Sequence, residues 1–234
     1  MNEGTPEMPD KLRYQKLDDE LAQIYREIRS LRINQHVFSE VQAMIRRSPD
    51  LHKPSTFYQW MGNMYAATMS ATVRRLVDQR KGTVSLVRLL ELVKQEPEVC
   101  SRAAYKSRCT NPGLSEDFLD MDYDSLVGKR KNQPDPAMIE REIKDLEART
   151  RRLKDFVDAH VAYLSVEPMR ELPKFRELDD AIDCLESALR RYLHQFRGVG
   201  LSSALPTWQY DWKEIFRYPW LGQGDAPPQK HRAG

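Results

Sequence analysis

The sequence predicts an all-α protein, an antiparallel bundle of four to five helices with one long loop. Only 10 of the 234 residues are glycine, whereas 40% are hydrophobic and 31% are charged, a composition typical of helix-rich proteins. Apolar residues also recur at intervals of three and four over several long segments, which is the period of an amphipathic helix. Four or five such helices in one chain favour a bundle.

The first periodic segment begins near Pro9 and predicts one very long helix. We leave open whether it bends near residues 34–36. Its apolar positions are Leu17, Leu21, Ile24, Ile28, Leu31, Phe38 and Ile45.

A second helix is predicted from about Phe57 to Val77, with Ser55 or Thr56 as its N-cap. Small side chains let a neighbouring helix approach closely, so we expect this helix to be the central and most buried one. A turn at residues 78–83 precedes a short helix that Ser85 caps. The small residues of the second helix are Ala66, Ala67, Ser70 and Ala71, and the apolar ones of the short helix are Leu86, Leu89, Leu90 and Val93.

Residues 107–134 contain prolines, glycines and the basic run at 129–131 without a sustained period. We interpret them as a long loop with at most a helical turn. Asp135 and Pro136 then form an N-cap followed by proline at the first helical position, which marks the start of a second long helix. Its apolar seam comprises Ile143, Leu146, Thr150, Leu153, Val157, His160 and Leu164. A histidine therefore takes a position where leucine is expected.

The last predicted helix runs from Phe175 to Phe196 and ends at Gly198. We expect a bundle domain over residues 9–197, an aromatic C-terminal strap over 198–221 and a disordered tail over 222–234. The strap carries Trp208, Trp212, Phe216 and Trp220, which we expect to pack on the bundle.

Composition excludes several classes of protein. No segment approaches the ~18 apolar residues of a membrane span, and the first residues lack the pattern of a signal peptide, so we expect a cytoplasmic protein without a membrane partner. Cys100, Cys109 and Cys184 are not spaced as metal ligands with histidine. We interpret them as free thiols and expect neither a metal nor a cofactor. Lys and Arg exceed Asp and Glu by only 37 to 35, so a nucleic-acid footprint must be local.

The order of these segments resembles the abortive-infection, AbiU-like branch of the HEPN superfamily. The resemblance covers roughly residues 17–196 and rests on the sequences VRRLVD at 73–78, SLVRLL at 85–90 and VDAHVAY at 157–163. Many HEPN proteins are homodimeric, metal-independent ribonucleases. Their signature is an arginine, often followed by Asn or Asp, with a histidine four to six positions beyond the arginine. The resemblance thus implies a helical bundle, a homodimer and an RNA target.

The signature fits this chain in two registers, and neither is intact. In the first, His160 is the family's histidine and Lys154 stands in place of the arginine. In the second, which we favour because it also matches a Val-Ala dipeptide, Tyr163 replaces the histidine, Asp158 follows the arginine position, and Val157 replaces the arginine itself.

Metal-free cleavage of RNA needs a base that removes the 2′-hydroxyl proton near neutral pH and a fixed cation beside the transition state. Imidazole suits the first task, whereas a tyrosine with a pKa of about 10 does not. Lysine lacks the bidentate fork of arginine. We therefore predict that ribonuclease activity is weak or absent.

Four arginines are candidates for RNA binding: Arg74 and Arg75 at the end of the second helix, and Arg149 and Arg152 on the long helix. Each also has a structural interpretation, since cations complement a helix C-terminus and a charged face is usually solvated. Likewise, Lys154 and Asp158 are spaced for an intrahelical ion pair, and a histidine on an apolar seam is more often part of a core or interface.

Two functions remain open from the sequence. The first is an RNA-targeting defence or toxin-antitoxin-type protein with a degenerate ribonuclease motif. The alternative is a non-catalytic, dimeric helical scaffold that binds a protein partner, such as an antitoxin. Basic residues that converge on one cleft would favour the first function. An uncharged cleft, with the aromatic tail docked elsewhere, would favour the second.

Overall fold

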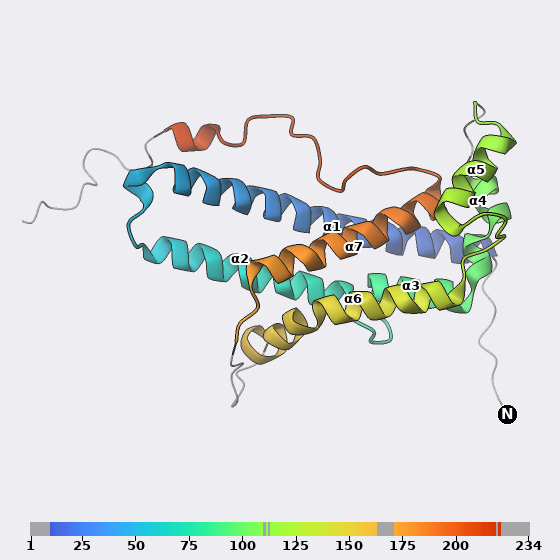
Figure 1. Ribbon diagram of the computed structural model, residues 1–234, viewed down its shortest axis with the longest axis horizontal. Helices are drawn as coiled ribbons and strands as arrows, with labels where there is room; N and C mark the ends of the chain where they lie inside the picture. The colour runs from blue at the N-terminus through green and yellow to red at the C-terminus, as the bar shows by residue number, and fades with distance from the viewer. Residues whose placement is uncertain (1–9, 110, 112, 163–170, 219, 221–234) are drawn as a thin grey trace, which may run out of the picture.

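Long helices form the body of the protein in the computed structural model, which describes residues 10–109, 111, 113–162, 171–218 and 220 (Figure 1). Within these residues, four helices have 21 residues or more, and no strand is present. The predicted all-α bundle is therefore confirmed. The long helices are α1 (Asp10–Arg47), α2 (Thr56–Leu76), α6 (Pro136–Phe156) and α7 (Phe175–Arg197), and the shorter ones are α3 (Leu86–Gln95), α4 (Arg102–Arg108) and α5 (Glu116–Val127).

The long helices alternate in direction along the bundle (Figure 1). α2 returns antiparallel to α1, α3 continues the course of α2 after a turn, α6 runs back beside both, and α7 closes the bundle against α1 and α6. α4 and α5 lie at one end of the bundle. None of the described helices is both long and apolar enough to cross a membrane.

Capping side chains start the helices where the sequence predicts. The Ser55 side chain accepts a hydrogen bond from the backbone N–H of Phe57, so Ser55 rather than Thr56 caps α2. Ser85 caps α3, and Asp135 caps α6 ahead of Pro136. Each cap satisfies a backbone donor that the first helical turn would otherwise leave free. Gly198, with φ of 63°, ends α7 in the left-handed conformation that glycine adopts without strain.

The prediction of a loop over residues 107–134 is wrong, because α5 occupies much of this segment. Ser115 caps α5, and Leu119, Tyr123 and Val127 recur every four residues on its buried face. The Tyr123 hydroxyl donates to the backbone oxygen of Cys100 at 2.7 Å. The neighbouring prolines and glycines bound this helix rather than break it, and its apolar face is covered by α4.

The prediction that α2 is the most buried helix is also wrong. Its second half contributes Met69, Val73 and Leu76 to the core, whereas Phe57 and Trp60 in its first half are 52% and 57% exposed. Of the small residues beyond them, Ser70 is buried, but Ala66, Ala67 and Ala71 are only half-buried. α7 is buried along most of its length instead, because it packs between α1 and α6.

The C-terminal strap runs alongside α1 (Figure 1), and only its first half is anchored. The ring of Trp208 stacks on His36 with centroids 5.8 Å apart, and Lys213 forms an ion pair with Glu40 at 2.5 Å. By contrast, Phe216 and Trp220 are 42% and 66% exposed. Packing of the predicted strap is thus confirmed near Trp208 and wrong at its far end. The tail over 222–234 lies outside the described residues.

This difference predicts unequal effects of two tryptophan substitutions. Trp208→Ala should lower the free energy of unfolding by about 2 kcal/mol, less than a fully buried tryptophan contributes, because the ring is partly covered. Trp220→Ala should change it by less than about 0.5 kcal/mol, because the ring is largely in solvent. Urea unfolding followed by circular dichroism measures both values. Equal losses would contradict the proposed docking of the strap.

Candidate functional site

The predicted catalytic segment lies where α6 changes its winding. At residues Val157–Val161 the helix becomes π-helical, and the backbone N–H of Ala162 bonds to the oxygen of Val157 at 2.8 Å. A π-helical turn holds more residues than an α-helical turn, so it shifts the following side chains around the axis. The apolar seam therefore stops at the buried Val157, and His160 is exposed, contrary to the predicted place in the seam. The His160 ring stacks on Phe156 with centroids 5.5 Å apart.

The structure separates the two residues of the first register. His160 lines a groove formed by α2, the π-helical turn and the start of α7. Lys154 lines a different hollow, beside Asp78 and Glu147. Val157, which replaces the arginine in the second register, is only 4% exposed and belongs to the protein interior. Tyr163 lies outside the described residues.

One candidate catalytic residue contacts one of the candidate RNA-binding residues. Asp158, from the π-helical turn, accepts a hydrogen bond from Nε of Arg74 on α2 at 2.7 Å. This contact replaces the intrahelical pair of Asp158 with Lys154 that the spacing suggested. It ties the end of α6 to α2, and because both side chains are partly exposed, its contribution to stability is modest.

The other candidate cations are likewise bound to acidic partners. Arg75 pairs with Glu27 at 2.9 Å, Arg149 with Asp145 at 2.8 Å and Arg152 with Glu177 at 2.6 Å. A phosphate would have to displace these carboxylates, which weakens the case for an RNA-binding edge. Among the described lining residues, none of the four arginines lines either the groove beside His160 or the hollow beside Lys154.

The groove beside His160 is mostly uncharged and has a volume of about 630 Å³. The small residues of α2 form one side of it, so the stripe that predicted close helix packing instead lines an open groove. Among the described residues that line the groove, the basic ones are His160 and Lys174. Its apolar lining includes Ala66, Ala67, Leu153, Phe156, Val161 and Leu172.

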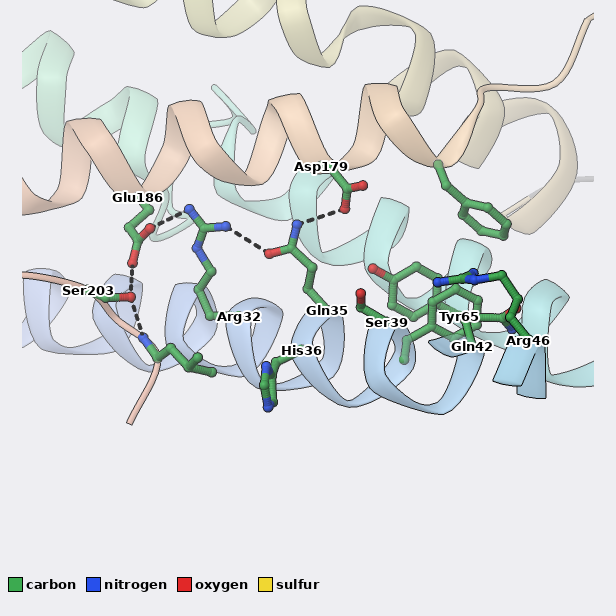
Figure 2. A pocket seen from close by; sticks show the side chains of 13 residues that line it. Arg32, Gln35, His36, Ser39, Gln42, Arg46, Tyr65, Asp179, Glu186 and Ser203 are labelled. Carbon is green, nitrogen blue, oxygen red and sulfur yellow. Dashed lines mark hydrogen bonds and ion pairs between the residues drawn. The ribbon is translucent and has the colours of Figure 1, made fainter. Parts of the chain in front are cut away.

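A second hollow, of about 620 Å³, is polar and lies between α1, α2, α7 and the strap (Figure 2). A chain of contacts crosses it. Arg32 pairs with Glu186 and donates to Gln35 at 2.8 Å, and Gln35 donates to Asp179 at 2.7 Å. Glu186 also accepts hydrogen bonds from the Ser203 hydroxyl at 3.0 Å and the backbone N–H of Ala204. These bonds join α1, α7 and the strap.

Glu186 is ionised at neutral pH despite its burial. Burial alone would raise the pKa of its carboxyl group, but the hydrogen bonds from Ala204, Arg32 and Ser203 and the charge of Arg32 outweigh burial and hold the pKa below its usual value. A buried carboxylate that lost these donors would be strongly destabilising.

Sequence reasoning missed this hollow, although α1 contains a signal for it. The inward stripe of α1 is apolar through Ile28 and Leu31. Gln35 and Gln42 stand seven and fourteen residues after Ile28, so they continue the same stripe with polar side chains. A polar residue at a core-facing position breaks the helix pattern, and such breaks are expected at functional or specially paired sites.

Comparisons with known proteins identify no relative of this chain. No protein-family model, curated protein or solved structure matched the chain.

The electrostatics of Glu186 predict a pH-dependent effect of Glu186→Gln. The pKa of Glu186 is lowered on folding, so its charge stabilises the fold above pH 4.5 and this stabilisation is lost as the pH falls through the folded-state pKa. At pH 7 the variant should lose about 2 kcal/mol of unfolding free energy, less than an unpaired buried charge costs, because glutamine keeps one acceptor. Below pH 4 the difference in unfolding free energy between Glu186→Gln and the natural chain should become smaller.

Asp183→Asn is the matched control, since Asp183 also pairs with Arg32 but its side chain is 63% exposed. This variant should lose less than about 1 kcal/mol at pH 7. Urea titrations across this pH range measure both differences. A gap for Glu186→Gln that stays constant or widens on acidification would contradict the assigned ionisation.

Proposed function

We propose that this protein is a HEPN-like helical bundle of the abortive-infection type that has lost catalysis and acts as a dimeric scaffold for a protein partner. The observation that carries this proposal is the mostly uncharged groove beside the degenerate motif. A cleft for RNA would present free cations at this place. Instead, small and apolar side chains line it, and the aromatic strap docks elsewhere, along α1.

The geometry of the motif supports the loss of catalysis in both registers. With Val157 in the arginine position, a buried apolar side chain stands where a transition-state cation is needed. With Lys154 and His160 as the pair, the cation and the base line different hollows. General-base and electrostatic catalysis require both groups within reach of one phosphodiester.

The same face supports a homodimer. Phe57, Trp60 and Met64 protrude from α2 beside the groove, and Val161 is 41% exposed on its other side. Exposed apolar side chains grouped on one face are typical of an interaction surface. A protruding ridge beside a groove suits a two-fold interface, in which the ridge of each copy fills the groove of the other.

RNA-targeting defence, or a toxin-antitoxin-type role, is the second candidate. One observation favours it: Arg151 and Lys154 are exposed on α6 and form no ion pair with another described residue. These two cations could contact an RNA backbone without displacing a carboxylate. Under either candidate, we expect the protein to act in the cytoplasm.

Substitution of Met64 tests the dimer. Met64 is 48% exposed and lines the groove, so Met64→Glu should leave the fold intact but place a charge in the interface. The natural chain should sediment as a dimer at tens of micromolar, and Met64→Glu should weaken the dimer by about a hundredfold, the range of a central interface residue.

Met121→Glu provides the matched control, since Met121 is 73% exposed on α5, away from the groove. It should sediment like the natural chain. A natural chain that remains monomeric at this concentration, or equal effects of the two variants, would rule out the proposed dimer face.

The degenerate motif predicts weak or absent cleavage of RNA. Loss of a fixed cation and of a general base each reduces the rate by on the order of a hundredfold or more. The natural chain, His160→Ala and the double variant Val157→Arg, Tyr163→His should be incubated with mixed RNA in the presence of a metal chelator. Circular dichroism should confirm folding, because Val157 is buried.

Robust cleavage by the natural chain that disappears in His160→Ala would overturn the proposal and restore the enzyme interpretation. Cleavage only by the double variant would support it, because the bundle would then be competent and only the catalytic pair replaced.

A further inference from the structure

The polar hollow between α1, α2, α7 and the strap contains more polar groups than the fold uses. Gln42 and Ser39 line it from α1, and Tyr65 lines it from α2. None of these side chains forms a hydrogen bond with another residue in the described part of the chain. Gln42 moreover continues the inward stripe of α1, where an apolar side chain such as leucine would add to the buried apolar surface of the bundle. Ser39 is exposed, but folding alone does not account for the half-buried Gln42 amide and Tyr65 hydroxyl.

The two acidic groups of the hollow are hydrogen-bonded to neighbouring residues to different extents. Asp179 accepts from the Gln35 amide at 2.7 Å. One oxygen of Glu186 accepts from Ser203 and the backbone of Ala204, and the other pairs with Arg32. Glu186 therefore offers no free oxygen to a cationic ligand, whereas Asp179 keeps one oxygen without a hydrogen-bond partner among the described residues.

Four of the residues that remain unpaired in the hollow carry donor groups. Arg46, one turn beyond Gln42 on the same face of α1, forms no ion pair with another described residue. The Ser39 and Tyr65 hydroxyls point into the hollow (Figure 2). Burial and the nearby Asp179 raise the pKa of Tyr65, so its hydroxyl keeps its proton and can donate. A guanidinium, two hydroxyls and an amide are suited to an anion.

Aromatic rings form the wall beside these donors. Phe38 stacks on Tyr65, with centroids 3.8 Å apart and planes 5° from parallel. Phe175 lies 5.4 Å from Phe38 and 5.7 Å from Tyr65. All three line the hollow. Such rings bind flat, apolar ligand groups by stacking and edge contacts, and a volume of about 620 Å³ is in the range of small-molecule sites.

From these features we propose that the hollow binds a small organic anion, a flat ring that carries one carboxylate or phosphate group. The ring packs against Phe38, Tyr65 and Phe175, and the anionic group faces Arg46 and the neighbouring hydroxyl and amide donors. Carboxylate and phosphate share the acceptor geometry that a guanidinium recognises. This site shares Phe175 with the groove beside His160 but no polar lining residue, so the proposal does not depend on the proposed scaffold function.

Calorimetric titration of the full chain tests the site with four probes. Benzoate and phenyl phosphate carry a ring and an anion, benzyl alcohol carries the ring alone, and inorganic phosphate carries the anion alone. We expect saturable binding of at least one ring anion, at least tenfold tighter than benzyl alcohol or inorganic phosphate. The tighter of benzoate and phenyl phosphate identifies the anionic group.

Two variants link binding to the named donors. Arg46→Gln should weaken binding of the ring anion at least tenfold, because it removes the cation. Arg47→Gln is the control: Arg47 is an exposed neighbour that does not line the hollow, and this change should leave the affinity within twofold. Tyr65→Phe, which keeps the stacked ring, should weaken binding about threefold or more, as expected for the loss of one hydrogen bond.

Three results would overturn the proposal. They are no saturable binding of benzoate or phenyl phosphate at millimolar concentration, equal affinity for benzyl alcohol and the ring anions, and unchanged affinity in Arg46→Gln. An unchanged circular-dichroism spectrum of each variant ensures that loss of binding does not reflect loss of the fold.

Discussion

The ion pair between Arg32 and Glu186 is the interaction on which the arrangement of α1, α7 and the strap depends. After Leu31 the inward stripe of α1 becomes mixed, with Gln35 and Gln42 beside Phe38 and Ile45. Glu186 is almost fully buried on the facing helix. A buried carboxylate is tolerated only with a full set of donors. Arg32 supplies the charge, and the start of the strap supplies a hydroxyl and a backbone N–H, so the strap is fixed where α1 and α7 meet.

A different constraint governs the groove beside His160. The π-helical turn at the end of α6 keeps Val157 in the interior and turns His160 outward, where it joins the groove along α2. π-helical turns inside helices are often found at functional sites. Here the turn separates His160 from Lys154 and leaves Asp158 beside Arg74. The same local change of winding thus supports both a non-catalytic motif and an apolar surface for a partner.

Local signals in the sequence predicted most of the helices, because a cap or a period of three and four depends on neighbouring residues alone. Ser85, Asp135 and Gly198 mark helix ends as predicted. Long-range pairing could not be predicted in this way: Arg32 and Glu186 are 154 positions apart. The sequence analysis also missed the exposure of His160, because it extended the α-helical period of the apolar seam through residue 160. RNA targeting, dimerisation and the catalytic residues stay predictions.

The central claim is that Gln42, on the inward stripe of α1, serves the binding hollow and not the fold, and Gln42→Leu tests it most directly. The Gln42 amide forms no hydrogen bond with another described residue and lies on a partly buried face. We predict that the free energy of unfolding, measured in urea at pH 7, stays the same or rises by up to about 1 kcal/mol, as expected when an unpaired polar group is replaced by an apolar one. A loss of more than about 1 kcal/mol would mean that the fold itself requires this glutamine, and would contradict the account.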